Sequence, residues 1–259
     1  MDFAQQLVNG VQIGSVYALV AIGYTMVYGI AKMINFAHGD IIMVGSYVAL
    51  LFFQSSGLPV WGVIAATAAV SAVLGVTIER LAYKPLRGGS RMSALITTIG
   101  VSLMLQNGFL LIFGSSPKPF PNHFTGEGFT LGGVTVSRLT AITLVVTVVL
   151  MVLLTLFVNR TRVGKAMRAV SEDQGAAQLM GINIDTSISI TFAIGSALAA
   201  VAAVLYSSTY PLINPYMGSM LGLRAFIAAV IGGIGVIPGA MIGGFIIGIA
   251  EALIKRYIS

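Results

Sequence analysis

Long runs without a charged residue most strongly constrain how this chain can fold. Such runs occupy residues 3–31, 41–78, 92–117, 139–159, 186–223 and 225–250. A helix that crosses the hydrocarbon core of a bilayer needs roughly 20 apolar residues, so every run can form a span. Charged residues make up 8% of the 259 residues, whereas about 25% is usual in soluble domains. The sequence therefore predicts an all-α, polytopic membrane protein, with residues 1–259 forming one transmembrane domain.

Two of the uncharged runs are long enough for two spans each, because 41–78 and 186–223 both contain 38 residues. The first is expected to break at 54–59, where Gly57 and Pro59 disfavour helix, and the second at 210–219. This gives about eight transmembrane or partly broken helices. They are expected at roughly 6–30, 36–53, 59–81, 93–113, 138–158, 187–209, 220–236 and 238–257. The glycine-containing pieces 36–53 and 220–236 are candidates for re-entrant or broken helices.

The net charge of +6 is explained by loops rather than by a nucleic-acid partner. If the N-terminus lies outside, nine of the 14 basic residues fall on the cytoplasmic side: Lys32, Arg80, Lys84, Arg87, Arg91, Arg160, Arg162, Lys165 and Arg168. The others are Lys118, Arg138, Arg224, Lys255 and Arg256. Cytoplasmic loops carry an excess of Lys and Arg, so this distribution predicts that the N-terminus is outside.

Motifs for catalysis or nucleotide binding are absent from the sequence. It contains no G-x-x-x-x-G-K-[ST], no G-x-S-x-G and no H-E-x-x-H, so neither a P-loop nor a familiar hydrolase site is predicted. The outer loop 114–137 contains His123 and Glu127, but two ligands in a loop make a poor metal site. We therefore expect no enzymatic activity, no metal and no cofactor bound by this chain itself.

A short polar segment, NFAHGD, precedes the second apolar helix and contains Asn35, His38, Gly39 and Asp40. Charges at membrane depth are costly and are usually functional or paired. These residues could line a polar cavity or a broken helix, or they could satisfy backbone and headgroups at the membrane interface. Further along, Glu79 lies beside Arg80 at a span end.

An internal similarity links 33–50, MINFAHGDIIMVGSYVAL, to 212–230, LINPYMGSMLGLRAFIAAV. Both segments follow a long apolar span and begin with Ile-Asn, which adds Asn214 to the polar candidates. The two would lie on opposite sides of the membrane, as in the inverted repeats that bracket a transport pathway. Because the match is short, chance remains the alternative. Near the chain end, Glu251 and Lys255 have the spacing of an i,i+4 ion pair.

A polar segment at 159–186 interrupts the apolar sequence and is predicted to form two short helices. In the first, Val163, Ala166, Met167 and Val170 recur at helical spacing. Ser171 and Gln174 fit a capping box at the start of the second. Gly181 fits its end.

The second of these helices would be about nine residues long, which is marginal in water without a partner surface. One interpretation is an amphipathic helix that rests on lipid headgroups. The other is a docking helix for a cytoplasmic protein.

Three segments together carry a family resemblance: INFAHGDIIMVGSYVA, RAVSEDQGAAQLMGI and AAVIGGIGVIPGAMIGGFIIGIAE. The second resembles the cytoplasmic coupling loop of ABC-transporter permeases. Taken together, in this order and over essentially the whole chain, they resemble the permease subunits of bacterial branched-chain amino acid ABC transporters. Urea and short-amide permeases share much of the pattern. Residues 159–186 are hereafter called the coupling segment.

The resemblance implies a subunit of the bacterial inner membrane that performs no covalent chemistry. Its implied partners are a second related permease, two cytoplasmic ATPases that bind ATP and Mg²⁺, and an extracytoplasmic substrate-binding protein. ATPase coupling would fall to Arg168, Glu172, Asp173, Ala176, Ala177 and Gly181. The candidate residues of the translocation pathway are Asn35, His38, Gly39, Asp40 and Asn214. Alternatives are the same architecture importing urea, short amides or other amino acids, and an ATP-independent carrier or channel.

Overall fold

The fold is predominantly helical. A computed structural model describes residues 2–87, 89–124, 126, 128–131 and 134–258. Its helices are α1 (Asp2–Ala31), α2 (His38–Ser55), α3 (Val60–Ile78), α4 (Arg91–Phe113), α5 (Arg138–Arg160), α6 (Arg162–Glu172), α7 (Gln174–Leu179), α8 (Ile184–Thr209), α9 (Met217–Ile231) and α10 (Ile237–Tyr257). A π-helical turn, η1 (Glu79–Tyr83), and a 3-10 turn, η2 (Lys84–Leu86), extend α3. The expectation of an all-α polytopic membrane protein is confirmed.

Six helices in the described part of the chain are long and apolar enough to cross a membrane: α1, α3 with its extension, α4, α5, α8 and α10. The other two expected segments are also helical, but they differ from these six. Helix α2 has 18 residues and begins with His38, Gly39 and Asp40, and α9 has 15 residues. These are the two segments expected to be re-entrant or broken.

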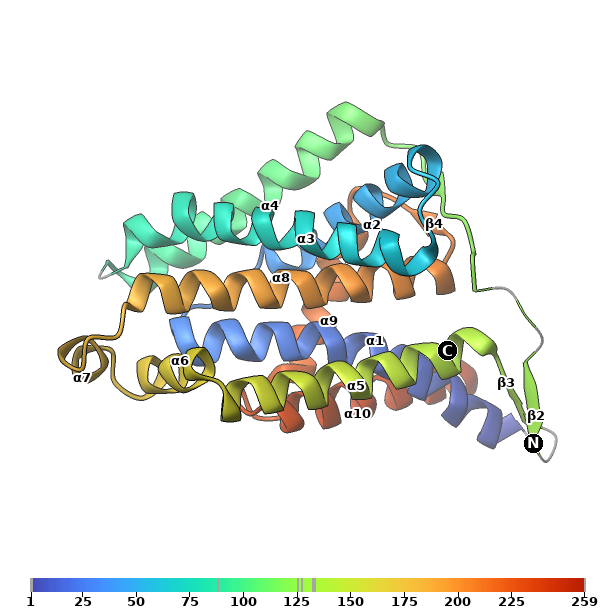
Figure 1. The fold of residues 1–259 in the computed structure, drawn as a ribbon. Coiled ribbons are helices and arrows are strands. Elements are labelled where there is room, and N and C mark those ends of the chain that lie inside the picture. The colour runs from blue at the N-terminus through green and yellow to red at the C-terminus, as the bar shows by residue number, and fades with distance from the viewer. Residues whose placement is uncertain (1, 88, 125, 127, 132–133, 259) are drawn as a thin grey trace.

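The helices form a bundle with two distinct ends (Figure 1). Helices α6 and α7 lie at one end, and the N-terminus and the hairpin of β2 (Phe129–Leu131) with β3 (Val134–Val136) lie at the opposite end. Helix α1 runs toward the α6 end, whereas α8 starts there and runs back. The coupling segment and the outer loop therefore lie at opposite ends of the bundle.

Helix α1 packs against α10 along a seam of small residues. A Cβ atom at Gly248 would lie 2.3 Å from the Cα atom of Gly14, and one at Gly244 would lie 2.5 Å from the Cα atom of Ala18. These distances leave no room for a side chain, so glycine lets the two backbones approach closely. Such packing is typical of helix association in lipid, where van der Waals contact replaces the hydrophobic effect.

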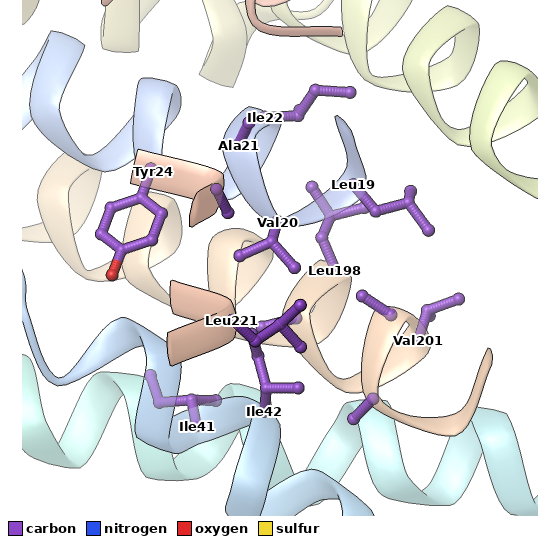
Figure 2. Close-up of a cluster of buried hydrophobic side chains, with 14 of the residues drawn as sticks. Leu19, Val20, Ala21, Ile22, Tyr24, Ile41, Ile42, Leu198, Val201 and Leu221 are labelled. Carbon is purple, nitrogen blue, oxygen red and sulfur yellow. The ribbon is translucent and has the colours of Figure 1, made fainter. Parts of the chain in front are cut away.

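The centre of the bundle is an apolar cluster supplied by α1, α2, α8 and α9 (Figure 2). Its fully buried members include Leu19 and Ile22 from α1 and Ile41 and Ile42 from α2. In an apolar 18-residue stretch of α1, 83% of the residues are buried, compared with 17% in the corresponding stretch of α4. Helix α1 is therefore the central helix, and α4 lies at the periphery of this chain.

The outer loop contains a short hairpin, with Phe129 opposite Val136. The side chain of Gln5 ties the hairpin to α1, since it donates to the carbonyl of Thr135 (3.0 Å) and accepts from its amide (2.9 Å). A second pairing joins β1 (Lys118–Pro119) to β4 (Leu212–Ile213), which precedes α9.

Helix α9 ends earlier than the predicted span 220–236. It stops at Ile231, and residues 232–236 form a turn before α10. Gly233 and Gly235 have positive φ values of 86° and 99°, a conformation that glycine adopts without a Cβ clash. Because residues 232–236 carry no polar side chain, hydropathy alone predicts that the span continues through them.

Candidate functional site

Helix α6 is fixed to the end of α5 by a close backbone contact. The hydroxyl of Thr161 accepts from the amide of Gly164 (3.0 Å) and caps the helix. A Cβ atom at Gly164 would lie 2.4 Å from the carbonyl oxygen of Phe157, so glycine allows this contact. Of the residues with helical spacing in the sequence, Met167 and Val170 are buried, while Val163 is exposed. The buried face therefore runs through 164, 167 and 170.

Helix α7 begins at a different residue from the one predicted. The cap is Asp173, whose Oδ1 accepts from the amide of Ala176 (3.0 Å). Ser171 instead lies within α6, where its hydroxyl donates to the carbonyl of Arg168 (2.7 Å). The predicted Ser171 capping box is therefore wrong, and α7 has 6 residues rather than the expected nine or so.

The predicted end of this helix at Gly181 is confirmed. Gly181 has a φ of +79°, and its amide donates to the carbonyl of Gln178 (3.0 Å) while the amide of Ile182 donates to that of Ala177 (3.0 Å). This pair of bonds is the Schellman motif that ends helices at a left-handed glycine. The motif turns the chain from α7 toward the start of α8.

The tip of α7 presents apolar side chains to the surroundings of the chain. Leu179 is 90% exposed and Met180 is 82% exposed, whereas Ala177 is buried against the rest of the protein. Beside this tip lies a cavity of about 570 Å³, lined by Arg87, Gln174, Gln178, Gly181, Ile182, Asn183, Ile184 and Asp185. A protruding apolar tip next to a polar hollow is suited to contact with another protein.

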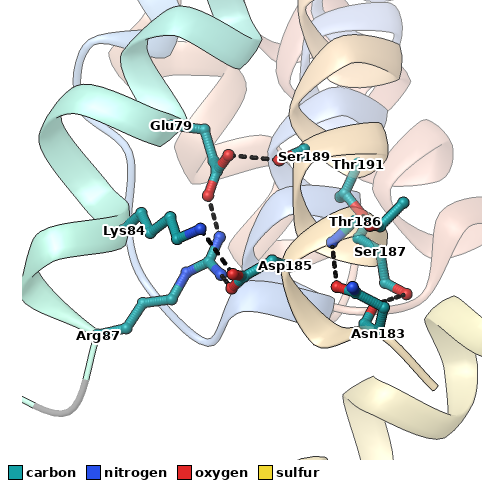
Figure 3. Close-up of polar contacts among 9 residues, drawn as sticks. All are labelled: Glu79, Lys84, Arg87, Asn183, Asp185, Thr186, Ser187, Ser189 and Thr191. Atoms are coloured by element: carbon teal, nitrogen blue, oxygen red, sulfur yellow. Dashed lines mark hydrogen bonds and ion pairs between the residues drawn. The ribbon is translucent and has the colours of Figure 1, made fainter. Parts of the chain in front are cut away.

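A network of charged residues joins the α3 extension to the start of α8 (Figure 3). The guanidinium of Arg87 forms ion pairs with both Glu79 and Asp185. Lys84 also pairs with Asp185, at 2.7 Å, and the hydroxyl of Ser189 donates to Glu79 at 2.6 Å. The carboxylate of Glu79 is fully buried, whereas Lys84 and Asp185 are half-exposed. The network fixes the start of α8 to the α3 extension where the coupling segment ends.

The start of α2 meets the start of α9 inside the bundle. A Cβ atom at Gly39 would lie 2.5 Å from the carbonyl oxygen of Gly218, and one at Gly218 would lie 2.4 Å from that of Gly39. A Cβ atom at Gly222 would likewise lie 2.6 Å from the Cα atom of Gly39. This reciprocal contact is possible because glycines occupy the first turns of both helices. We call it the α2–α9 junction.

A polar cluster lies at the α2–α9 junction and reaches α4. The side-chain amide of Gln106 donates to Oδ1 of Asp40 (2.9 Å) and to the hydroxyls of Ser219 (2.8 Å) and Ser102 (3.0 Å). Asp40 is fully buried. Gln106 therefore links the first turns of α2 and α9 to the peripheral helix α4.

Several buried polar atoms next to this cluster have no hydrogen-bond partner within the described protein. They are both amide atoms of Asn35, Nε2 of His38 and Oδ2 of Asp40. His38 packs its ring against Tyr24 at 4.6 Å between centroids. A buried polar group without a partner costs about 1–3 kcal/mol, so the junction is a place where a polar ligand or water would be stabilised.

The two similar segments noted in the sequence form the same local turn. The carbonyl of Asn35 accepts from the amide of His38, and that of Asn214 accepts from the amide of Met217, each at 3.2 Å. The side chain of Asn214 accepts from the amide of Tyr216 (2.9 Å) and is not among the contacts of the polar cluster. The inverted repeat itself stays a prediction.

With the architecture established, comparison with known proteins gives the family. A family model described as branched-chain amino acid transport system, permease component, matches residues 6–259. The chain belongs to this permease family. The permease is 49% identical over 263 residues to the high-affinity branched-chain amino acid transport system permease protein BraD of Pseudomonas aeruginosa, an alignment that covers 96% of this chain and 85% of the relative.

Two further relatives carry similar names. The permease is 47% identical over 270 residues to the high-affinity branched-chain amino acid transport system permease protein LivH of Escherichia coli, which covers 99% of this chain and 87% of that relative. It is 32% identical over 250 residues to a probable branched-chain amino acid transport permease protein LivH of Methanocaldococcus jannaschii, which covers 93% and 78% of the two chains. The similarity thus extends over nearly the whole permease.

The candidate residues of the permease fall into two groups at different depths. Near the bundle end, Glu172, Asp173 and Ala176 are exposed on or beside α7, and Arg168 and Glu172 line a cavity of about 310 Å³. Inside the bundle, Asn35, His38, Gly39 and Asp40 gather at the α2–α9 junction. In the outer loop, the ring of His123 stacks on Phe53 at 4.2 Å, and Glu127 lies outside the described residues.

Three important residues escaped the sequence argument. Arg87 pairs with Glu79, where the sequence pointed to the adjacent Arg80. Gln106 was hidden in a long uncharged run. Arg224 separates two uncharged runs, which was the available signal, and its guanidinium contacts Glu251 (2.8 Å). The predicted pair of Glu251 and Lys255 is confirmed at 2.5 Å.

Proposed function

We propose that the chain is a transmembrane permease subunit of an ABC importer for branched-chain amino acids. It would contribute to the translocation pathway by alternating access, driven by separate ATPase subunits that bind ATP and Mg²⁺. Its membership of the permease family and the names of its relatives support this assignment. No covalent chemistry is assigned to the permease.

The observation that carries the proposal is the apolar tip of α7. Leu179 and Met180 are almost fully exposed at one end of the bundle, although burying such a side chain stabilises a contact by about 1.5–3 kcal/mol. In the proposed complex an ATPase subunit covers both side chains. The six residues of α7 are too few for an isolated helix to be stable in water, and the ATPase supplies the missing support.

Movement of α7 would reach the spans through two rigid connections. On one side, Gly164 holds α6 against α5. On the other, the Schellman turn at Gly181 leads into α8, and Asp185 in its first turn is bound to Lys84 and Arg87 of the α3 extension. A displacement of α7 would therefore shift α5, α8 and α3 together. An ATPase can bias this equilibrium only by contacting the two permease states differently.

The proposed orientation places α6 and α7 in the cytoplasm and the N-terminus outside, in the bacterial inner membrane. The excess of Lys and Arg on the α6 side supports it. In this orientation the outer loop faces the extracytoplasmic substrate-binding protein. A second, related permease subunit would complete the pathway, and the polar α2–α9 junction is proposed to border it.

The proposal is tested by reconstituting the permease in lipid with the permease, ATPase and binding-protein subunits encoded beside it. ATP hydrolysis is measured with binding protein offered leucine, urea or no ligand. Stimulation by leucine alone supports both the assignment as an ABC importer and the assigned substrate class. Stimulation by urea supports the importer assignment but changes the assigned substrate. Failure to assemble with any ATPase would refute the proposal and favour a helix resting on headgroups.

A paired substitution tests the docking role of α7 itself. Met180→Glu should reduce recovery of the ATPase with the purified permease by at least tenfold, because a carboxylate would be buried without a partner at the contact. Val163→Glu provides the control, since Val163 is an exposed apolar residue of α6. Equal ATPase recovery for the Met180→Glu variant and the unmodified permease would show that α7 is not part of the docking surface.

A further inference from the structure

A cluster of charged side chains joins three helices in the outer half of the bundle. Arg224 of α9 donates to the phenol oxygen of Tyr17 in α1 (2.9 Å) and to Oε1 of Glu251 in α10 (2.8 Å). The hydroxyl of Tyr17 donates to the other oxygen of Glu251 (2.6 Å). Lys255 adds a second cation at 2.5 Å from Glu251. The cluster therefore contains two positive charges and one negative charge.

The cluster is open on one side. Tyr17 is buried, but the side chains of Arg224, Glu251 and Lys255 are 36%, 14% and 58% exposed. Arg224 lies within α9, two residues after Gly222 of the α2–α9 junction. Its guanidinium reaches Tyr17, in the middle of the 30-residue helix α1. Arg224 is therefore exposed at the depth of the spans, whereas Lys255, in the last turn of α10, lies nearer the outer end of the bundle.

Exposure of these charges to hydrocarbon is energetically unfavourable. Ionisable residues within spans usually face a bundle interior or a water-filled cavity and mark routes for polar solutes. A purely structural ion pair would gain from being enclosed, whereas this one leaves a guanidinium one-third accessible. The open side of the cluster is therefore expected to face an aqueous route.

A cleft of about 300 Å³ borders the cluster toward the outer end of the bundle. Its lining consists mainly of polar and charged side chains from α1, α8 and α10: Gln6, Asn9, Gln12, Ile13, Thr209, Tyr210, Ala252, Lys255 and Arg256. Lys255 belongs to both the cleft and the cluster. The cleft and the cluster therefore adjoin at Lys255, and a solute that entered the cleft from outside would meet this charge of the cluster first.

We propose that Arg224 and Glu251 form a transit site that receives the carboxylate and the ammonium group of a zwitterionic α-amino acid. The inference rests on the proposed function, and it assigns within the pathway the two groups that touch the cargo. The carboxylate pairs with Arg224 and Lys255, and the ammonium group pairs with Glu251. Met220 and Leu223, which are exposed on α9 beside Arg224, provide apolar contact for the side chain of the amino acid.

The resting contacts explain why such a site would release its ligand easily. In the empty permease Arg224 and Lys255 both pair with Glu251. A zwitterion brings one charge of each sign, so its carboxylate can pair with the two cations and its ammonium group with Glu251. The two resting ion pairs must break before the new ones form, so the net gain is small, binding is weak and the amino acid passes onward.

The decisive experiment replaces both charges with apolar residues of similar size, in Arg224→Met/Glu251→Leu. A structural ion pair can be replaced in this way with little loss of stability, whereas a transit site cannot. In the reconstituted complex, we expect the melting temperature to stay close to that of the unmodified permease. Ligand-stimulated ATP hydrolysis should stay within twofold of the unmodified rate. Uptake of radiolabelled leucine should fall at least tenfold. Uptake at the unmodified rate in the double variant would overturn the proposal.

Two further variants keep the experiment informative if the double variant fails to assemble. Glu251→Gln keeps an oxygen that accepts from Arg224 and gains an amide that can donate to the phenol oxygen of Tyr17, but it removes the partner of the ammonium group. It should lower uptake at least tenfold per ATP hydrolysed. Lys118→Gln removes a positive charge from the outer loop, outside the cluster, and should leave uptake per ATP hydrolysed unchanged. Unchanged uptake by Glu251→Gln would also overturn the proposal. If the unmodified complex shows no ligand-stimulated hydrolysis, the proposed function itself has failed.

Discussion

Replacing Arg87 with methionine should destabilise the permease because it leaves the buried carboxylate of Glu79 without its cation. Removing one partner of a buried ion pair costs about 3–5 kcal/mol. Arg87 is 19% exposed and the hydroxyl of Ser189 still donates to Glu79, so we expect about 3 kcal/mol. Lys84→Met is the matched control. The side chains of Lys84 and its partner Asp185 are both half-exposed, and such ion pairs contribute less than about 1 kcal/mol.

The assay is unfolding in detergent, monitored for each single variant and for Arg87→Met combined with Glu79→Gln. If the loss comes from the uncompensated carboxylate, Arg87→Met should cost roughly 2 kcal/mol less in the Glu79→Gln background than alone. Equal costs in the two backgrounds would show that the two side chains are not coupled. A loss for Lys84→Met as large as that for Arg87→Met would equally refute the reasoning.

Two further predictions concern glycines. Gly248→Val should prevent accumulation of monodisperse permease in size-exclusion chromatography, because its Cβ would lie 2.3 Å from the Cα atom of Gly14; Gly100→Val, at a position of α4 with open space around it, should behave like the unmodified protein. Gly181→Ala should strain the left-handed turn by about 1–2 kcal/mol and lower the leucine transported per ATP without affecting membrane insertion. Gly175→Ala within α7 is its control, and equal coupling in both variants would exclude the turn as a transmission element.

Much of the architecture follows from local chemistry in the sequence. The spans could be located because hydropathy and length alone decide whether a segment suits a bilayer. Gly57 and Pro59 separate α2 from α3, and Gly181 ends α7, because these residues restrict or permit particular backbone angles. The pairing of Glu251 with Lys255 follows from helical spacing.

The features that could not be predicted from the sequence depend on how elements far apart in the chain meet. Ser171 and Asp173 are both good caps, and the choice between them depends on α6 continuing to Glu172 before the chain extends. Gln106 gains its importance only because α4 lies beside the α2–α9 junction. Arg224 could be recognised as a break in an uncharged run, but its partners come from helices far away in the sequence.

The meeting of α2 and α9 has an electrostatic consequence. Each helix start carries about half a positive elementary charge, because the peptide dipoles align along the axis. The two starts approach each other through Gly39 and Gly218, so the backbone concentrates about one positive charge inside the bundle. The acidic side chain at this position is Asp40, whose Oδ1 is held by Gln106. A negative charge on Asp40 would lie next to this backbone charge, which cannot be removed by mutating a basic side chain.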